Sequence, residues 1–241
     1  RAYPAMNATL PRLWFDALHA NPWFAALPAP ERQALLAEAE VLRLPSGAML
    51  FHQGDAALAA GGGFYALVQG LIKVSTVRQD GREAILAVLE PGNWFGEISL
   101  LDGSPRTHDA TALTAIDVLV VPPAAFTRQM QGLAFAQAIA ALLAARVRGL
   151  YGLMEDTTLR GLRARVAHRL LTLARGDATQ SPDVRPAVSL PQEALAMMLG
   201  ITRQTLSKEL AALARDGVLK LGYRRIEIVS VAALEAVVHD T

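Results

Sequence analysis

Residues 191–217, PQEALAMMLGITRQTLSKELAALARDG, predict two short helices joined by a tight turn. Pro191 lies at the start of the first helix, where its missing N–H costs nothing, and Gly200 lies at the end, where a left-handed residue is needed. Two residues make the turn. The second of them, Thr202, caps another helix that ends before Gly217.

The small and apolar residues of this segment follow the spacing of a helix-turn-helix. Ala196 is small and lets the two helices cross closely, Gly200 makes the turn, and Leu206 anchors the second helix beneath the first. The pattern predicts a helix-turn-helix, and a plain helical hairpin with the same caps is the alternative.

The second helix carries polar side chains at its N-terminal end, where a recognition helix meets base edges in the major groove. Arg203 offers a two-pronged donor to guanine, Gln204 can bridge adenine, and Lys208 can reach a base or a phosphate. Hydroxyl and amide side chains near the helix starts are candidates for phosphate contacts. These candidates are Gln192, Thr202, Thr205 and Ser207.

A hairpin is predicted after this unit, as in a winged helix-turn-helix. Its strands are Val218 to Leu221 and Arg225 to Val229, turning at Gly222-Tyr223. Arg224, at the tip, is a candidate for contact with the DNA backbone.

The charge distribution favours double-stranded DNA as a partner of the C-terminal part. Residues 158–241 carry 12 Lys and Arg against 8 Asp and Glu, a net of +4, whereas residues 1–157 carry 11 against 14, a net of −3. A basic region is typical of a polyanion-binding surface, although a solvated face can have the same charge.

Composition excludes several classes of function. The 241 residues include no cysteine, so disulfides, thiolate metal sites and cysteine nucleophiles are ruled out. No run of ~18 apolar residues lacks a charge or a helix breaker, and residues 1–30 lack the layout of a signal peptide. We therefore expect a cytoplasmic protein with no membrane span.

The N-terminal half predicts a sandwich or barrel of short strands. Glycines divide it at Gly47, Gly54, Gly70, Gly81, Gly92 and Gly96. Predicted strands lie between them at Phe64 to Val68, Leu71 to Val77, Ala84 to Leu89 and Val118 to Val121. Asp80-Gly81 is a two-residue hairpin signal, and a helix is predicted from Pro30 to Glu40.

A long helix is predicted from Pro123 to about Thr157. Its apolar stripe has heptad spacing, which favours a dimer partner; packing on its own β-domain is the alternative. The candidate interface residues are Leu143, Val147, Leu150 and Met154. Arg146 and Arg148 flank the stripe and can pair with Glu155 or Asp156, within the chain or across the dimer interface.

These elements predict an α+β fold in three parts. Residues 1–122 form a jelly-roll-like double-stranded β-roll, 123–158 a long dimerisation helix, and 159–241 a winged helix-turn-helix domain that opens with a helix from Leu162 to Ala174.

One loop of the β-domain carries groups suited to a small anionic ligand. It is PGNWFGEISLLDGSPRT, residues 91–107. Gly96 permits close approach of a ligand, and N–H groups of the turn that follows it, at Ile98 and Ser99, can cradle an anion. Arg106 and Thr107 supply a donor fork and a hydroxyl for a phosphate. Glu97 can accept from a sugar hydroxyl.

From about Pro22 to Val229 the chain resembles the CRP/FNR superfamily of bacterial regulators. The resemblance rests on the loop just quoted, on Gly54-Asp55 and Gly70, and on the helix-turn-helix residues. It implies an allosteric homodimer joined by the long helix, two recognition helices in successive major grooves of a palindromic site, and contact with RNA polymerase. It also implies that Gly96, Glu97, Arg106 and Thr107 hold the ribose and the phosphate of a cyclic nucleotide, cyclic AMP or cyclic GMP.

Three positions depart from that pattern. Leu150-Tyr151 stands where cyclic-AMP-responsive activators use Thr-Ser on the long helix, so purine recognition differs or is absent. His108-Asp109 stands where a small residue follows the phosphate-binding pair; it narrows the pocket, or His108 only makes a hydrogen bond within the loop. Gln204 replaces an acidic residue of many relatives, which predicts a changed half-site.

Other readings of the function stay open or fit less well. A cyclic dinucleotide or another ligand is the alternative effector, and a regulator without a ligand is also an alternative. An alternative from a different class is a β-roll that regulates an enzyme. Haem or iron–sulfur sensing lacks cysteine ligands and a histidine spacing, although His52 and His108 stay open. A hydrolase would need a nucleophile beside Glu97 and His108. We therefore expect no catalytic residues, no metal and no covalent cofactor.

Overall fold

The computed structural model describes residues 11–58, 62–77, 81, 83–176, 184–223 and 225–239. The chain forms two compact units that divide inside one helix, between Arg146 and Val147. The first unit comprises Arg1–Thr76 and Ala87–Arg146, and the second comprises Val77–Leu86 and Val147–Thr241. Each unit is described by itself below.

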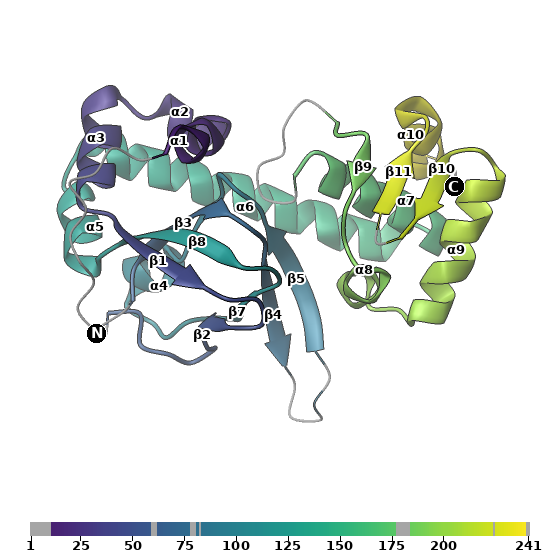
Figure 1. Ribbon diagram of the computed structural model, residues 1–241, viewed down its shortest axis with the longest axis horizontal. Helices are drawn as coiled ribbons and strands as arrows, with labels where there is room; N and C mark the ends of the chain where they lie inside the picture. Colours follow the sequence, from purple (N-terminus) through teal and green to yellow (C-terminus); the bar gives the residue numbers. More distant parts are fainter. Residues whose placement is uncertain are drawn as a thin grey trace. The chain divides into compact units, whose positions relative to one another are not determined.

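The first unit contains two four-stranded sheets, apart from Val77 and residues 83–86, which belong to the second unit (Figure 1). The first sheet has the order β1-β8-β3-β6, and the second has the order β2-β7-β4-β5. The strands are β1 (Glu40–Leu44), β2 (Met49–Phe51), β3 (Phe64–Gln69), β4 (Ile72–Val77), β5 (Glu83–Leu89), β6 (Trp94–Phe95), β7 (Asp109–Ala112) and β8 (Ile116–Val121). This arrangement confirms the predicted mixed fold with an N-terminal β-domain.

Strand β3 is buried on both faces, and it therefore separates two hydrophobic clusters. Successive side chains of a strand point to opposite faces of its sheet. Phe64 and Ala66 join a cluster formed with the helices, whereas Tyr65 and Leu67 join the cluster made only by strand residues. Every residue from Phe64 to Val68 is buried, which explains why this run is continuously apolar instead of alternating.

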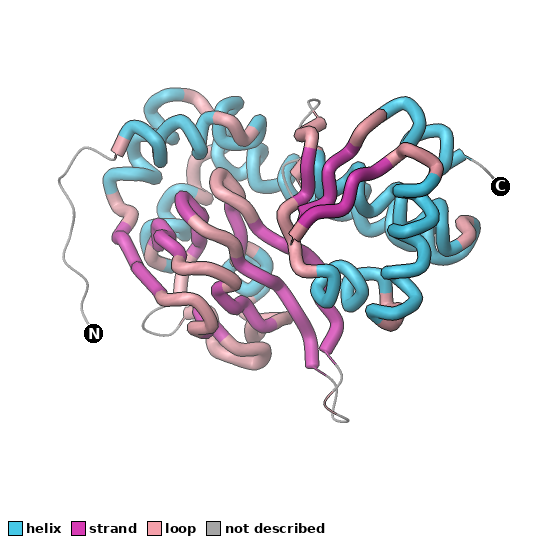
Figure 2. Tube along the Cα trace, turned by 45° about the vertical axis from the view of Figure 1, so that its right-hand side comes forward, coloured by secondary structure: helices cyan, strands magenta, loops and turns pink. Residues whose placement is uncertain are grey.

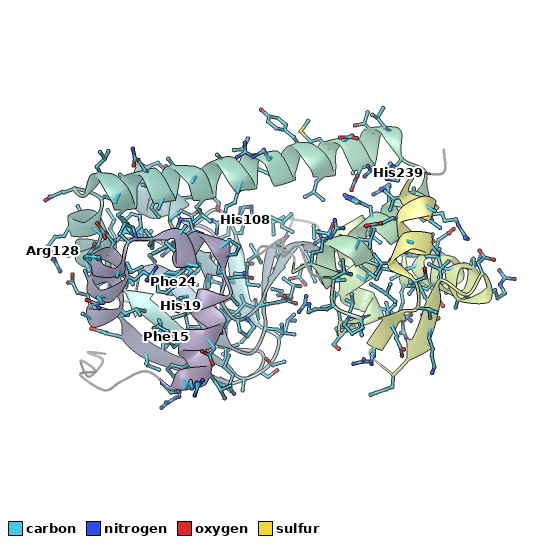
Figure 3. All side chains as sticks on the ribbon, turned by 90° about the horizontal axis from the view of Figure 1, so that it is seen from above. Phe15, His19, Phe24, His108, Arg128 and His239 are labelled. Carbon is cyan, nitrogen blue, oxygen red and sulfur yellow. The ribbon has the colours of Figure 1, made fainter. Side chains whose placement is uncertain are left out.

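Five helices lie wholly in the first unit among the described residues, and three of them, α1, α2 and α4, were not predicted. The helices are α1 (Arg12–His19), α2 (Pro22–Ala26), α3 (Ala29–Ala37), α4 (Ile98–Asp102) and α5 (Pro123–Gln129). In Figure 3 the ring of His19 lies between Phe15 and Phe24, at centroid distances of 3.8 and 5.2 Å. Arg128, labelled in the same figure, pairs with Glu38 at the end of α3.

The long helix is shorter than predicted because the helix is interrupted after Gln129. Helix α5 ends there, and α6 (Leu133–Leu159) begins after Gly132. The break allows Phe126 and Phe135 to pack edge to face, with ring centroids 5.7 Å apart. The predicted continuous helix from Pro123 was therefore wrong at its N-terminal end, while Gly149 and Gly152 lie within α6 without breaking it.

Helix α6 changes character along its length. Phe135 and Ile139 are buried in the core of the first unit, whereas side chains from Val147 onward are mostly exposed. By length and composition α6 is also apolar enough to cross a membrane, contrary to the expectation from the sequence. Phe135 and Ile139 belong to a folded core, and a single helix that passes this test on length and composition alone is weak evidence for a membrane span.

The second unit contains a three-stranded sheet and four complete helices among the described residues (Figure 2). The elements are α7 (Leu162–Ala174), β9 (Ala187–Val188), α8 (Gln192–Leu199), α9 (Arg203–Arg215), β10 (Leu219–Gly222), β11 (Arg225–Ile228) and α10 (Val231–His239). The sheet order is β10-β11-β9. Helix α7 and the β10–β11 hairpin match the prediction, whereas β9 and α10 were not predicted.

Candidate functional site

The loop that ends at Arg106 is tied to the turn at Gly54-Asp55 by backbone hydrogen bonds. The Gly54 N–H donates to the Arg106 carbonyl at 2.8 Å, and the Arg106 N–H donates to the Asp55 carbonyl at 2.8 Å. The Asp55 carboxylate in turn accepts from the His52 N–H at 2.8 Å. These bonds fix the backbone position from which the Arg106 side chain starts.

Gly96 is required for a reason that differs from the prediction. Its φ of +91° lies in the left-handed region, and a Cβ would come within 3.0 Å of the Tyr65 ring and of Arg106 Nη1. The close approach is therefore made by the protein's own side chains, whereas the sequence suggested an approach by a ligand.

The Arg106 guanidinium is buried and already holds two carbonyls. Nη1 donates to the Gly96 carbonyl at 2.7 Å, and Nη2 donates to the Gly63 carbonyl at 2.8 Å. The guanidinium also lies over the rings of Phe51 and Tyr65, 4.6 and 5.3 Å from their centroids. Burial lowers the pKa of Arg106, which nevertheless stays charged because an arginine starts so high.

Glu97 is fully buried and forms an ion pair that the sequence did not predict. Its Oε1 accepts from Arg146 Nη1, and Arg146 Nη2 donates to the Trp94 carbonyl at 2.6 Å. Glu97 Oε2 has no hydrogen-bond partner among the described residues. The expected pairing of Arg146 with Glu155 or Asp156 was therefore wrong, because Arg146 turns toward the β-domain.

The residues after Glu97 form a short helix, α4, where the sequence predicted only a turn. Ser99 is buried, and its hydroxyl donates to the Pro105 carbonyl at 3.2 Å, so it closes the loop on itself. Ile98 is 40% exposed. Both backbone N–H groups lie in the first turn of α4, where helices leave N–H groups unpaired.

Thr107 is exposed beside Arg106, and its hydroxyl contacts the next residue. Thr107 Oγ1 lies 2.8 Å from His108 Nδ1. The alternative reading of His108, as a hydrogen-bonding residue within the loop, therefore agrees with the structure. Burial lowers the pKa of the His108 imidazole, and the nearby Asp109 carboxylate partly opposes that shift.

The helix-turn-helix has the predicted caps. Gly200 adopts a left-handed φ of +67° at the end of α8, and Thr202 caps α9 by accepting from the Thr205 N–H at 3.1 Å. Ala196 and Leu206 are buried where the two helices meet. The predicted local structure of this segment is therefore confirmed.

The candidate DNA-reading side chains share the outer side of α9. Arg203, Gln204 and Lys208 are exposed, while Leu206, Leu210 and Leu213 are buried beneath them. Thr205 and Gln192 are half-buried, and Ser207 is exposed. Arg224 lies outside the described residues, as does Asp80 of the predicted hairpin turn.

The candidate interface residues of α6 divide into two groups. Leu143 packs partly against the core of the first unit, as the alternative reading expected. The other three are exposed, Val147 by 46%, Leu150 by 60% and Met154 by 64%. On the same helix, Tyr151 is 66% exposed and Leu159 is 71% exposed. A run of exposed large apolar side chains on one helix is typical of a surface that another chain covers.

A second buried carboxylate lies at the C-terminal end of α6. Asp156 pairs through Oδ1 with Arg160 Nη1 and through Oδ2 with His168 Nδ1. Its partners come from the residue that follows α6 and from α7, so the cluster joins these two helices within the second unit.

Among the described residues, no group of three His, Asp or Glu side chains is arranged to hold a metal ion. His52 and His108 lie near the same carboxylate, Asp109, but His52 Nδ1 is 3.8 Å from its Oδ1.

Comparison with known proteins defines the class. Residues 41–132 match the cyclic nucleotide-binding domain, and residues 164–237 match the Crp-like helix-turn-helix domain. A β-domain of the first kind with a helix-turn-helix of the second defines an effector-responsive, DNA-binding transcriptional regulator.

Relatives matched over most of the chain place it in a family. The cyclic AMP receptor protein of Thermus thermophilus is 31% identical over 218 residues, covering 90% of this chain and 96% of that protein. The CRP-like cAMP-activated global transcriptional regulator of Mycobacterium tuberculosis is 30% identical over 190 residues, covering 78 and 83%. The chain belongs to the CRP family of transcriptional regulators, which confirms the predicted class.

A solved structure supports the same fold. A CRP-family transcriptional regulator from Thermus thermophilus superposes with a TM-score of 0.65 at 29% identity, covering 83% of this chain and 97% of that one.

Proposed function

We propose that this regulator is a homodimer that binds a cyclic nucleotide monophosphate in its β-domain and a palindromic DNA site through α9. The observation that carries the effector part is Glu97. A fully buried carboxylate oxygen without a partner among the described residues costs about 1–3 kcal/mol, which a donor from a ligand would recover.

A ribose hydroxyl supplies the donor that Glu97 Oε2 lacks. Arg106 and Thr107 then bind the phosphate, together with the backbone of Gly96, Ile98 and Ser99. A guanidinium has five N–H donors, and the two carbonyl bonds of Arg106 leave others for an anion. The similarity to a protein named as a cyclic AMP receptor supports this class of ligand.

Calorimetric titration with cyclic AMP and with cyclic GMP tests the effector. We expect one of them to bind, and Arg106→Ala to remove that binding. If neither gives heat at high micromolar concentration, these two effectors are eliminated and a cyclic dinucleotide becomes the next candidate. Unchanged affinity in Arg106→Ala would show that the arginine serves only the loop.

The second half of α6 is the proposed dimer interface. Val147, Leu150 and Met154 recur at intervals of three and four on one side of the helix, and all three are exposed in the single chain. Arg146 precedes this stripe on the same helix and pairs with Glu97, so a ligand at Glu97 acts on the helix that holds the dimer together. Sedimentation of Leu150→Lys should show monomers where the natural chain gives dimers.

In the DNA part, Arg203 reads guanine, Gln204 reads adenine, and Lys208 reaches a base or a phosphate. Gln192, Thr202 and Thr205 are assigned to phosphates, together with Arg224. Sequencing of genomic fragments bound to the protein yields the site. Arg203→Ala should then weaken binding to that site by about 1–3 kcal/mol and relax one base preference, whereas an equal loss on every sequence would assign Arg203 to a phosphate.

The remaining partners follow from the family. A dimer on a promoter site would contact RNA polymerase in the cytoplasm, where its DNA and nucleotide ligands occur. Pull-down of polymerase subunits on promoter DNA tests this assignment.

A further inference from the structure

The contact between Thr107 and His108 exists in two forms that differ in the position of a proton. A threonine hydroxyl has one proton to donate, and a neutral imidazole nitrogen is either a donor or an acceptor. At 2.8 Å, either Thr107 Oγ1 donates to a bare His108 Nδ1, or a protonated Nδ1 donates to Thr107 Oγ1. The two forms leave Thr107 with different capacities toward a ligand.

Only the second form suits a phosphate. The oxygens of a phosphodiester accept hydrogen bonds and donate none, so Thr107 must direct its proton at the ligand. While Thr107 donates to His108, that proton is not available. When Nδ1 carries a proton, Thr107 accepts from His108 and is free to donate to the anion.

The surroundings of His108 set its ligand-free state. Burial lowers the pKa of the imidazole, and Asp109 opposes that effect only in part. The Asp109 carboxylate is itself engaged, since its Oδ1 accepts from the Gln53 N–H at 2.7 Å and lies 3.8 Å from His52 Nδ1. The buried Arg106 guanidinium is the neighbouring cation along the chain. His108 is therefore mostly neutral at pH 7 in the free protein.

An anion bound at Thr107 changes that balance. A negative charge close to an imidazole favours the protonated form and raises its pKa. A neutral imidazole can carry its one proton on Nε2 and leave Nδ1 as an acceptor, or carry it on Nδ1. The imidazolium carries protons on both nitrogens, so protonation leaves only the form of the Thr107–His108 hydrogen bond that suits the phosphate. Geometry and charge thus act in the same direction.

We propose that His108 is a positioning residue of the effector site, which takes up a proton as the phosphate binds and thereby turns the Thr107 hydroxyl toward it. This inference rests on the proposed effector site. Its consequence is that acid strengthens the binding of the effector.

The direction of the pH effect follows from linkage. Because the bound protein holds the proton more tightly than the free protein, affinity is highest below the pKa of free His108 and declines as pH rises through the higher pKa of the complex. With one proton taken up, the Kd rises by up to about tenfold for each pH unit in that interval.

Calorimetry of cyclic AMP and cyclic GMP between about pH 5 and pH 8, the range in which histidine titrates, tests the proposal on the full chain. Repeating the titration in buffers of different ionisation enthalpy gives the number of protons taken up. We expect a value between zero and one that varies with pH. His108→Asn, whose amide can donate without titrating, should abolish the uptake and leave a Kd that varies by less than about twofold.

His52→Gln is the matched control, because His52 faces the same Asp109 but makes no contact with Thr107 among the described residues. The His52→Gln variant should show the same dependence of the effector's Kd on pH as the natural chain. Binding without proton uptake overturns this inference alone, as does uptake that persists in His108→Asn or disappears in His52→Gln. Failure of both nucleotides to bind at every pH overturns the proposed effector site together with it.

Discussion

Two buried carboxylates, one in each unit, are paired with arginine in different ways. Asp156 is 7% exposed and uses both oxygens, one on Arg160 and one on His168. Glu97 is not exposed at all, yet only one of its oxygens has a partner among the described residues, on Arg146. Asp156 therefore uses both oxygens to connect two helices, whereas Glu97 keeps one acceptor oxygen that a ligand can use.

The largest effect expected from this difference is on effector binding. Glu97→Gln keeps the shape of the side chain and one acceptor for Arg146, but it removes the charge and the second acceptor. A hydrogen bond to a charged group contributes about 1.5–3 kcal/mol, so affinity should fall by ten- to roughly 100-fold. Calorimetry measures this loss. Asp156→Asn is the control and should bind the effector as the natural chain does; an equal loss there would erase the distinction.

The second-largest effect is on the free energy of unfolding, and we expect it from a substitution of Asp156. Asp156→Ala removes the carboxylate that joins the end of α6 to α7, and it takes from Arg160 and His168 the acceptor that each of them contacts. Removing one partner of a buried pair costs about 3–5 kcal/mol, which we reduce to about 2 kcal/mol because Arg160 and His168 are partly exposed. Hydrogen exchange of the α7 amides should accelerate accordingly. Unchanged protection would show that packing alone joins the helices.

The smallest effect compares the two arginines. Arg146→Gln leaves Glu97 without its charged partner, whereas Arg160→Gln leaves Asp156 with His168. The first change should cost about 1 kcal/mol more than the second, since an uncompensated buried charge is the more expensive state. Urea denaturation of both variants at neutral pH measures the difference, and equal costs would contradict it.

The helix-turn-helix could be predicted almost to the residue because its signals are local. Pro191, Gly200 and Thr202 each act on backbone groups within a few positions of themselves. The strands β3, β4, β5 and β8 were predicted for a similar reason, since glycines and apolar runs mark their ends. Strands β1 and β2 were missed because their burial is only partial, so their apolar pattern is weak.

The candidate effector site was predicted by residue type but not by partner. Glu97 and Arg106 were identified from the loop sequence, yet Glu97 pairs with an arginine 49 positions away, and Arg106 holds a carbonyl 43 positions away. No local pattern encodes such pairings. The break between α5 and α6 was missed as well, since the helical pattern does not mark the packing of Phe126 on Phe135 across it.

The backbone link between Gly54-Asp55 and Arg106 has a consequence for how this regulator can diverge. Because main-chain atoms alone make both hydrogen bonds, the side chains of Thr107 and His108 can be exchanged without breaking this link. New chemical preferences can then accumulate at these two positions while the backbone that presents them persists. The ligand preference of this loop can therefore change faster in evolution than its backbone structure.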